Sequence, residues 1–126
     1  MDKMSTYILN NWNRYGIEAI KSRKDMARLL AFFDYIGYSF ELMHEDILNG
    51  CDFIGGTMGL FENDNAYVNY IFENVIFFDT MAEAFAHILD YAMYCNTDID
   101  DVCNDFAFSV DDIKQSNGLY FIDYRC

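Results

Sequence analysis

Carboxylates are the chemically active side chains that this sequence supplies in greatest number, with 21 Asp and Glu against eight Lys and Arg. Pairs of carboxylates can act as general acid and base or hold catalytic metal ions. Here such pairs are so frequent that none stands out. The most metal-like spacing begins at Asn96 and places Asp98 and Asp100 at the third and fifth positions of an EF-hand loop. Asp101 then stands where glycine is needed and Ala107 where the bidentate glutamate is needed, so we expect no dedicated metal site.

The two histidines are the other candidates for acid and base chemistry. Glu45 directly follows His44, and Glu83 lies one helical turn before His87. Either ring could act as a base, but no nucleophile pattern accompanies them. Histidines that are solvated or ion-paired at the surface are therefore the favoured interpretation, and we predict that the protein is not an enzyme.

Two patterns that could hold a cofactor are incomplete. The four cysteines contain no CxxC pair, which favours reduced, mostly buried thiols over zinc ligands or disulfides. The glycines at 55, 56 and 59 lack the lysine of a phosphate-binding loop, so we expect a flexible connector over residues 55–65. We predict no cofactor. A carboxylate pair with a perturbed pKa in a closed pocket would restore the enzyme interpretation.

Charge is distributed very unevenly along the chain. Residues 29–113 form a stretch of 85 residues that holds 17 carboxylates and no Lys or Arg, within a chain of net charge −13. Proteins bind nucleic acid by placing Lys and Arg against phosphates, so direct binding to nucleic acid is excluded. A field of this sign attracts a basic protein instead.

A surface of spaced carboxylates can imitate the phosphates of DNA. Double-stranded DNA carries one charge per roughly 1.7 Å, so the 17 carboxylates match about 8–9 base pairs. Acidity that only keeps the chain soluble is the competing explanation, although mixed charges would achieve the same. The predicted partner-binding acidic face comprises Glu83, Asp90, Asp98, Asp100, Asp101, Asp105, Asp111 and Asp112. A secondary patch comprises Glu41, Glu45, Asp46, Glu62 and Asp64.

Capping residues and hydrophobic spacing predict the helices that position these carboxylates. A short helix is expected from a Ser5 cap to Gly16, and others over residues 22–37, 39–50 and 80–92. The last has a capping box of Thr80 and Glu83. Its expected apolar stripe is Met81, Ala84, Phe85, Ile88, Leu89 and Ala92.

The expected strands are fewer and shorter. Aromatic and β-branched residues predict strands at 67–72 and 75–78, although a buried helix would give the same pattern. A brief helix capped by Ser109 is expected through Lys114, followed by a turn at Asn117-Gly118 and a final strand at 119–124.

The composition bounds the fold class. With 53% hydrophobic residues, 12 Phe and 10 Tyr, the chain should fold despite its charge. We expect an α+β protein, mostly helical with a small antiparallel sheet, as a single compact domain over residues 1–126. The loop at 55–65 is where any subdomain boundary is expected. No apolar run approaches the length of a membrane span, and residues 1–6 hold no apolar run, so we expect a cytoplasmic protein.

Two segments resemble a known family. Residues 105–123 read DFAFSVDDIKQSNGLYFID, and residues 78–89 read FDTMAEAFAHIL. Together they resemble the C-terminal part of ArdA-type antirestriction proteins over about 45 residues, without that family's N-terminal domain. The resemblance implies an inhibitor from a phage or mobile element that imitates DNA, blocks a host defence nuclease and forms a homodimer. An anti-CRISPR protein is an equally natural interpretation.

A second class of function is kept open. A protein-protein interaction or regulatory module would bind its partner through exposed aromatic residues such as Trp12, Tyr67 and Tyr70. In that case aromatic substitutions, and not charge reversal, would remove binding.

Overall fold

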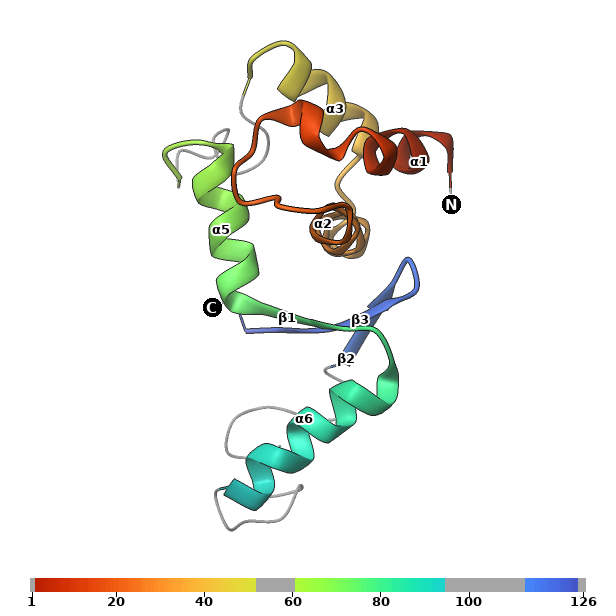
Figure 1. Ribbon diagram of the computed structural model, residues 1–126, viewed down its shortest axis with the longest axis vertical. Coiled ribbons are helices and arrows are strands. Elements are labelled where there is room, and N and C mark those ends of the chain that lie inside the picture. Colours follow the sequence, from red (N-terminus) through yellow and green to blue (C-terminus); the bar gives the residue numbers. More distant parts are fainter. Residues whose placement is uncertain (1, 52–60, 95–112, 125–126) are drawn as a thin grey trace. The chain divides into compact units, whose positions relative to one another are not determined.

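The computed structural model describes residues 2–51, 61–94 and 113–124, without the side chains of residues 91–94 (Figure 1). These residues form five α-helices and a three-stranded antiparallel sheet, so the predicted mostly helical α+β class is confirmed. The chain divides into two compact units, residues 1–74 and 75–126. None of the helices in the described ranges is long and apolar enough to span a membrane.

The first unit begins with helix α1 (Lys3–Asn10), followed by the 3-10 helix η1 (Trp12–Tyr15). The predicted cap at Ser5 is wrong, because Asp2 is the N-cap and its Oδ1 accepts the Ser5 N–H at 2.7 Å. Ser5 is buried inside the helix. Aspartate caps as well as serine does, so the helix can start earlier. The predicted end at Gly16 is wrong for this helix, because α1 ends at Asn10 with Asn11 as its C-cap. Gly16, with a left-handed φ of 68°, ends η1 instead.

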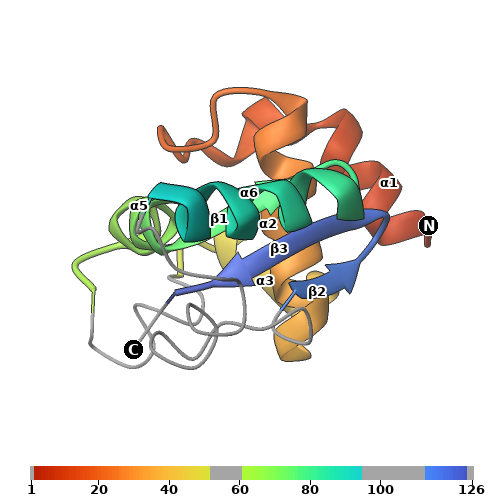
Figure 2. The same cartoon turned by 90° about the horizontal axis from the view of Figure 1, so that it is seen from below.

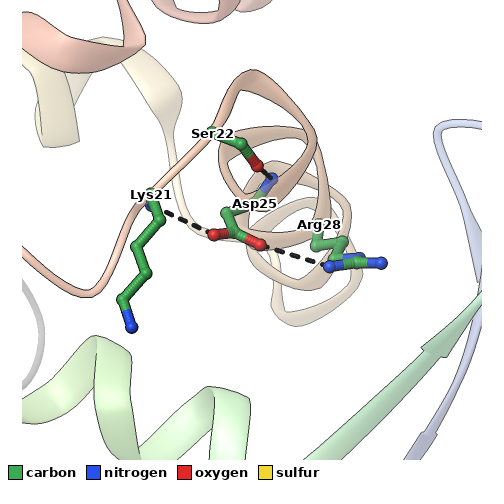
Figure 3. A network of polar contacts seen from close by, with 4 residues as sticks. All are labelled: Lys21, Ser22, Asp25 and Arg28. Atoms are coloured by element: carbon green, nitrogen blue, oxygen red, sulfur yellow. Dashed lines mark hydrogen bonds and ion pairs between the residues drawn. The ribbon is translucent and has the colours of Figure 1, made fainter.

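Helix α2 (Arg23–Ile36) follows the prediction closely. Ser22 Oγ accepts the Asp25 N–H at 3.1 Å, and Asp25 Oδ2 accepts the Lys21 N–H at 3.0 Å (Figure 3). Asp25 Oδ1 also pairs with Arg28 at 3.2 Å. The helix ends at Gly37, where φ is 79°. It supplies more buried residues than any other helix of this unit, namely Met26, Leu29, Leu30, Ala31, Phe32 and Phe33.

Helix α3 (Phe40–Leu48) is capped by Ser39, whose Oγ accepts the Leu42 N–H at 3.4 Å. This is the predicted cap. Met43 is buried and ties the helix to the core, whereas Phe40 and Ile47 are half-buried. Gly50 follows the helix with φ at 74°.

The strand predicted at residues 67–72 is wrong, because these residues lie in helix α5 (Asp64–Asn74). Asn63 Oδ1 accepts the Ala66 N–H at 2.9 Å and caps this helix. The buried residues Tyr67, Val68 and Ile71 follow helical spacing, and the Tyr67 ring stacks on Phe33 at 6.3 Å. Packing and the asparagine cap therefore override the β-propensity of the aromatic residues.

The second unit contains the sheet, with strand order β1-β3-β2. Strand β1 (Val75–Phe78) pairs with β3 (Leu119–Asp123), and β2 (Ile113–Ser116) pairs with β3 from the other side. Asn117 and Gly118 connect β2 to β3 with φ of 50° and 78°, as a two-residue hairpin turn requires. The helix predicted up to Lys114 is wrong at residues 113 and 114, because this turn pairs them with β3. Residues 109–112 lie outside the described residues.

Helix α6 (Met81–Tyr94) packs against β1 and β3 (Figure 2). Its capping box is confirmed, since Thr80 Oγ1 accepts the Glu83 N–H at 3.2 Å and Glu83 Oε2 accepts the Asp79 N–H at 3.0 Å. Ala84 and Ile88 are buried in a cluster with Ile113 and Ile122. The predicted apolar stripe is only partly correct, because its remaining described members are exposed, namely Met81, Phe85 and Leu89.

Candidate acidic partner-binding surfaces

Two members of the predicted acidic face lie on α6. Glu83 and Asp90 are both exposed and are seven residues apart, which places them on the same side of the helix. Their separation along the helix axis is about 10 Å at 1.5 Å per residue. The capping box fixes the Glu83 carboxylate at the start of the helix. The other six members lie outside the described residues, namely Asp98, Asp100, Asp101, Asp105, Asp111 and Asp112.

The opposite flank of α6 is apolar. Met81, Phe85 and Leu89 recur every four residues, and Phe85 points nearly opposite to Glu83 at 100° per residue. The helix therefore separates its exposed carboxylates from its exposed apolar side chains.

The secondary patch has its clearest members on α3. Glu41 and Glu45 are exposed and lie one turn apart on one side of the helix. Asp46 is half-buried and accepts a hydrogen bond from the Tyr38 hydroxyl at 3.2 Å. Only the two glutamates of this helix are therefore fully presented to a partner.

Glu62 and Asp64 belong to a different part of the first unit. Glu62 is exposed just before α5, and Asp64 is the first residue of that helix and is half-buried. Asp64 lines a surface hollow of about 370 Å³ together with Tyr15, Gly16, Ile17, Glu18, Asn63 and Asn65. The secondary patch is thus divided between α3 and the start of α5.

Sequence reasoning missed a second acidic hollow. It has a volume of about 400 Å³ and is lined by residues from α1, the end of α2 and the start of α3. Its charged lining residues are Asp2, Asp34, Glu41 and Lys3, which are three carboxylates and one ammonium group. The hydrogen bond from the Ser5 N–H holds the pKa of Asp2 below its usual value. These residues come from three separate segments of the chain, so their spacing in the sequence does not predict that they line one hollow.

The interpretation of the histidines as solvated or ion-paired is wrong. His44 is half-buried, and its Nδ1 lies 2.9 Å from the Tyr15 hydroxyl. The ring also meets Tyr7 edge-on, with centroids 5.2 Å apart. Burial raises the pKa of Tyr15, with a smaller contribution from Tyr7. The His44 ring therefore links α3 to η1 and packs within the first unit.

His87 has an equivalent arrangement in the second unit. Its Nε2 lies 3.0 Å from the Tyr124 hydroxyl, and its ring centroid lies 5.5 Å from that of Phe78. Glu83 and Asp90 therefore form the exposed polar face of α6, while His87 contacts Phe78 and Tyr124 on the sheet side. The helical spacing alone allowed either placement.

Other expected features have mixed outcomes. Cys51 is a free thiol, as predicted, but it is exposed and not buried. The other three cysteines lie outside the described residues. Among the described residues, no three His, Cys, Asp or Glu side chains are grouped to hold a metal ion. Of the aromatics considered for partner binding, Tyr67 is buried, and Trp12 and Tyr70 are half-buried.

Comparison with known proteins places the chain in no family, since no protein-family model, curated protein or solved structure matches it. The resemblance to ArdA-type antirestriction proteins stays an expectation. The candidate surfaces are thus defined by their own charges and exposure.

Proposed function

We propose that this protein is a non-enzymatic inhibitor that binds the basic nucleic-acid-binding surface of a host defence nuclease as a DNA mimic. The nuclease is a CRISPR effector or a restriction enzyme in the bacterial cytoplasm, and the inhibitor originates from a phage or mobile element. The observation that carries the proposal is the exposure of Glu41, Glu45, Glu83 and Asp90 within the 85 residues that contain no Lys or Arg.

The placement of these carboxylates is suited to meeting a basic surface. Glu83 and Asp90 are about 10 Å apart along α6, which corresponds to about three base-pair steps of 3.4 Å on one DNA strand. Stability gains nothing from so many like charges, because they repel one another. Charge complementarity with a basic cleft would accelerate association and set the specificity.

Binding should weaken when these charges are neutralised. The test variant combines Glu41→Gln, Glu45→Gln, Glu83→Gln and Asp90→Asn. Glutamine keeps the capping hydrogen bond of residue 83, so the helix start is preserved. At about 0.2–1 kcal/mol for each of the four exposed charges, the loss is about 0.8–4 kcal/mol, so affinity should fall by about fourfold to several hundredfold.

The partner would first be captured from a defence-competent bacterial lysate at low salt, eluted with high salt, and then purified for titration at several salt concentrations. The control is Glu73→Gln, an exposed glutamate that belongs to neither predicted surface. Affinity that is independent of salt, or equal for the test variant and the native protein, would refute the proposal.

The alternative is an interaction module that binds through aromatic side chains. Tyr7 and Tyr35 favour it, because they are 38% and 45% exposed, whereas Tyr67 is buried. If this alternative holds, Tyr35→Ala removes binding and the charge-neutralised variant keeps it.

A further inference from the structure

Helix α3 exposes leucines beside its glutamates. Leu42 is 54% exposed and Leu48 is 55% exposed, the two highest values among the large hydrophobic residues that the structure describes. At 100° per residue, Leu42 and Leu48 bound an arc of about 120°. Glu41 and Glu45 lie within that arc. Met43 lies outside it, is 1% exposed, and anchors the helix to the core.

This arrangement differs from that of α6. On α6 the exposed carboxylates and the exposed apolar side chains lie on opposite sides of the helix. A flat partner surface could therefore contact either the carboxylates or the apolar side chains, but not both. On α3 a partner that reaches Glu45 also covers Leu42. Imitation of phosphates needs carboxylates alone, so the leucines indicate an apolar contact that nucleic acid mimicry does not explain.

The acidic hollow adjoins this face of α3. Phe40 and Glu41 belong to the first turn of the helix and line the hollow, which has a volume of about 400 Å³. Asp2 and Asp34 bring its carboxylates to three, against Lys3 alone. A Lys or Arg side chain is the group that such a hollow would accept, because it matches the charge.

We propose that the exposed arc of α3 and the adjoining hollow form one docking surface for a protein segment that carries apolar side chains next to Lys or Arg. The apolar side chains cover Leu42 and Leu48, and a basic side chain enters the hollow beside Glu41. This is the pattern of a helix that binds in a groove with a charged rim. The inference rests on the proposed function, because it describes how the basic partner is held at short range.

The test uses two synthetic 18-residue peptides with the same number of lysines, one with leucines at helical spacing and one with serines in their place. Fluorescence anisotropy would give the Kd of each peptide for the intact protein. The test variant is Leu42→Ser with Leu48→Ser, and the control is Met81→Ser with Leu89→Ser on α6. All four positions are exposed, so the fold should be kept, and circular dichroism checks this.

We expect the native protein and the α6 control to prefer the leucine peptide by about tenfold or more, from burial of two leucines. The α3 variant should lose this preference and keep its salt-dependent affinity for both peptides. Methyl chemical shifts of Leu42 and Leu48 should move on titration with the leucine peptide. A preference that survives in the α3 variant overturns the inference, as does self-association through α3 detected by light scattering.

The outcomes for the two proposals are separable. If salt weakens peptide binding but the leucines have no effect, the docking surface is wrong and the acidic inhibitor stands. If salt has no effect on binding of either the peptides or the captured partner, the inhibitor proposal itself fails.

Discussion

We predict that Asp25 stabilises the first unit through three interactions at the start of α2. Its carboxylate accepts the Lys21 N–H at 3.0 Å and pairs with Arg28 at 3.2 Å. It also lies in the first turn of α2, where a negative charge favours the helix dipole. Asp25→Ala removes all three interactions at once.

The expected loss follows from these interactions. The hydrogen bond contributes about 0.5–1.5 kcal/mol and the partly exposed ion pair about 0.2–1 kcal/mol. The dipole term adds about 0.3–1 kcal/mol, so Asp25→Ala should lower the free energy of unfolding by about 2 kcal/mol. Asp25→Asn keeps an acceptor for the Lys21 N–H and should lose about half as much.

Urea denaturation followed by circular dichroism would measure both variants. The midpoint should fall in the order native, Asn, Ala, with an unchanged m-value. Arg28→Ala is the matched control, because it removes the ion pair alone. If Asp25→Ala is no more destabilising than Arg28→Ala, then the hydrogen bond from the Lys21 N–H to Asp25 does not stabilise the start of α2.

Two further predictions concern other turns and caps. Asp2 has a lowered pKa because it accepts the Ser5 N–H, so its contribution to stability is complete above its unfolded pKa and is lost as the pH falls through its folded pKa. Asp2→Asn should therefore flatten the acid limb of a stability curve measured below about pH 4, and an unchanged limb would contradict this. Gly118 has φ of 78° in the β2–β3 turn, so Gly118→Ala should lower the free energy of unfolding by about 1 kcal/mol or more. The thermal midpoint measures this loss, and Gln115→Ala, at the exposed position of β2, is a control that should have little effect.

The elements that sequence alone predicted correctly are those with a complete local signal. Ser22 with Asp25 and Thr80 with Glu83 fix the starts of α2 and α6, because the hydrogen bonds join residues three or four positions apart. The predicted strand at 67–72 failed because its helical state depends on the Asn63 cap and on packing of Tyr67 against Phe33. Pairing of Ile113 with Ile122 similarly decides the structure of residues 113 and 114.

The candidate site was predictable in charge but not in arrangement. The composition revealed the acidic stretch, and helical spacing paired Glu41 with Glu45 and Glu83 with Asp90. The acidic hollow was not predictable, because Asp2, Asp34 and Glu41 come from three elements. The exposure of Leu42 and Leu48 could have been found on a helical wheel, since Met43 and Ile47 define the other side of α3.

The strand order of the sheet has a consequence for synthesis on the ribosome. Val75 of β1 pairs with Asp123 of the central strand β3, 48 residues later in the chain. At about 5–20 residues per second, an emerging β1 waits roughly 2–10 s for its partner strand to be made. During that interval Val75, Ile76, Phe77 and Phe78 form an unpaired apolar strand. Repulsion between the carboxylates of neighbouring copies would oppose aggregation of the nascent chain during this interval.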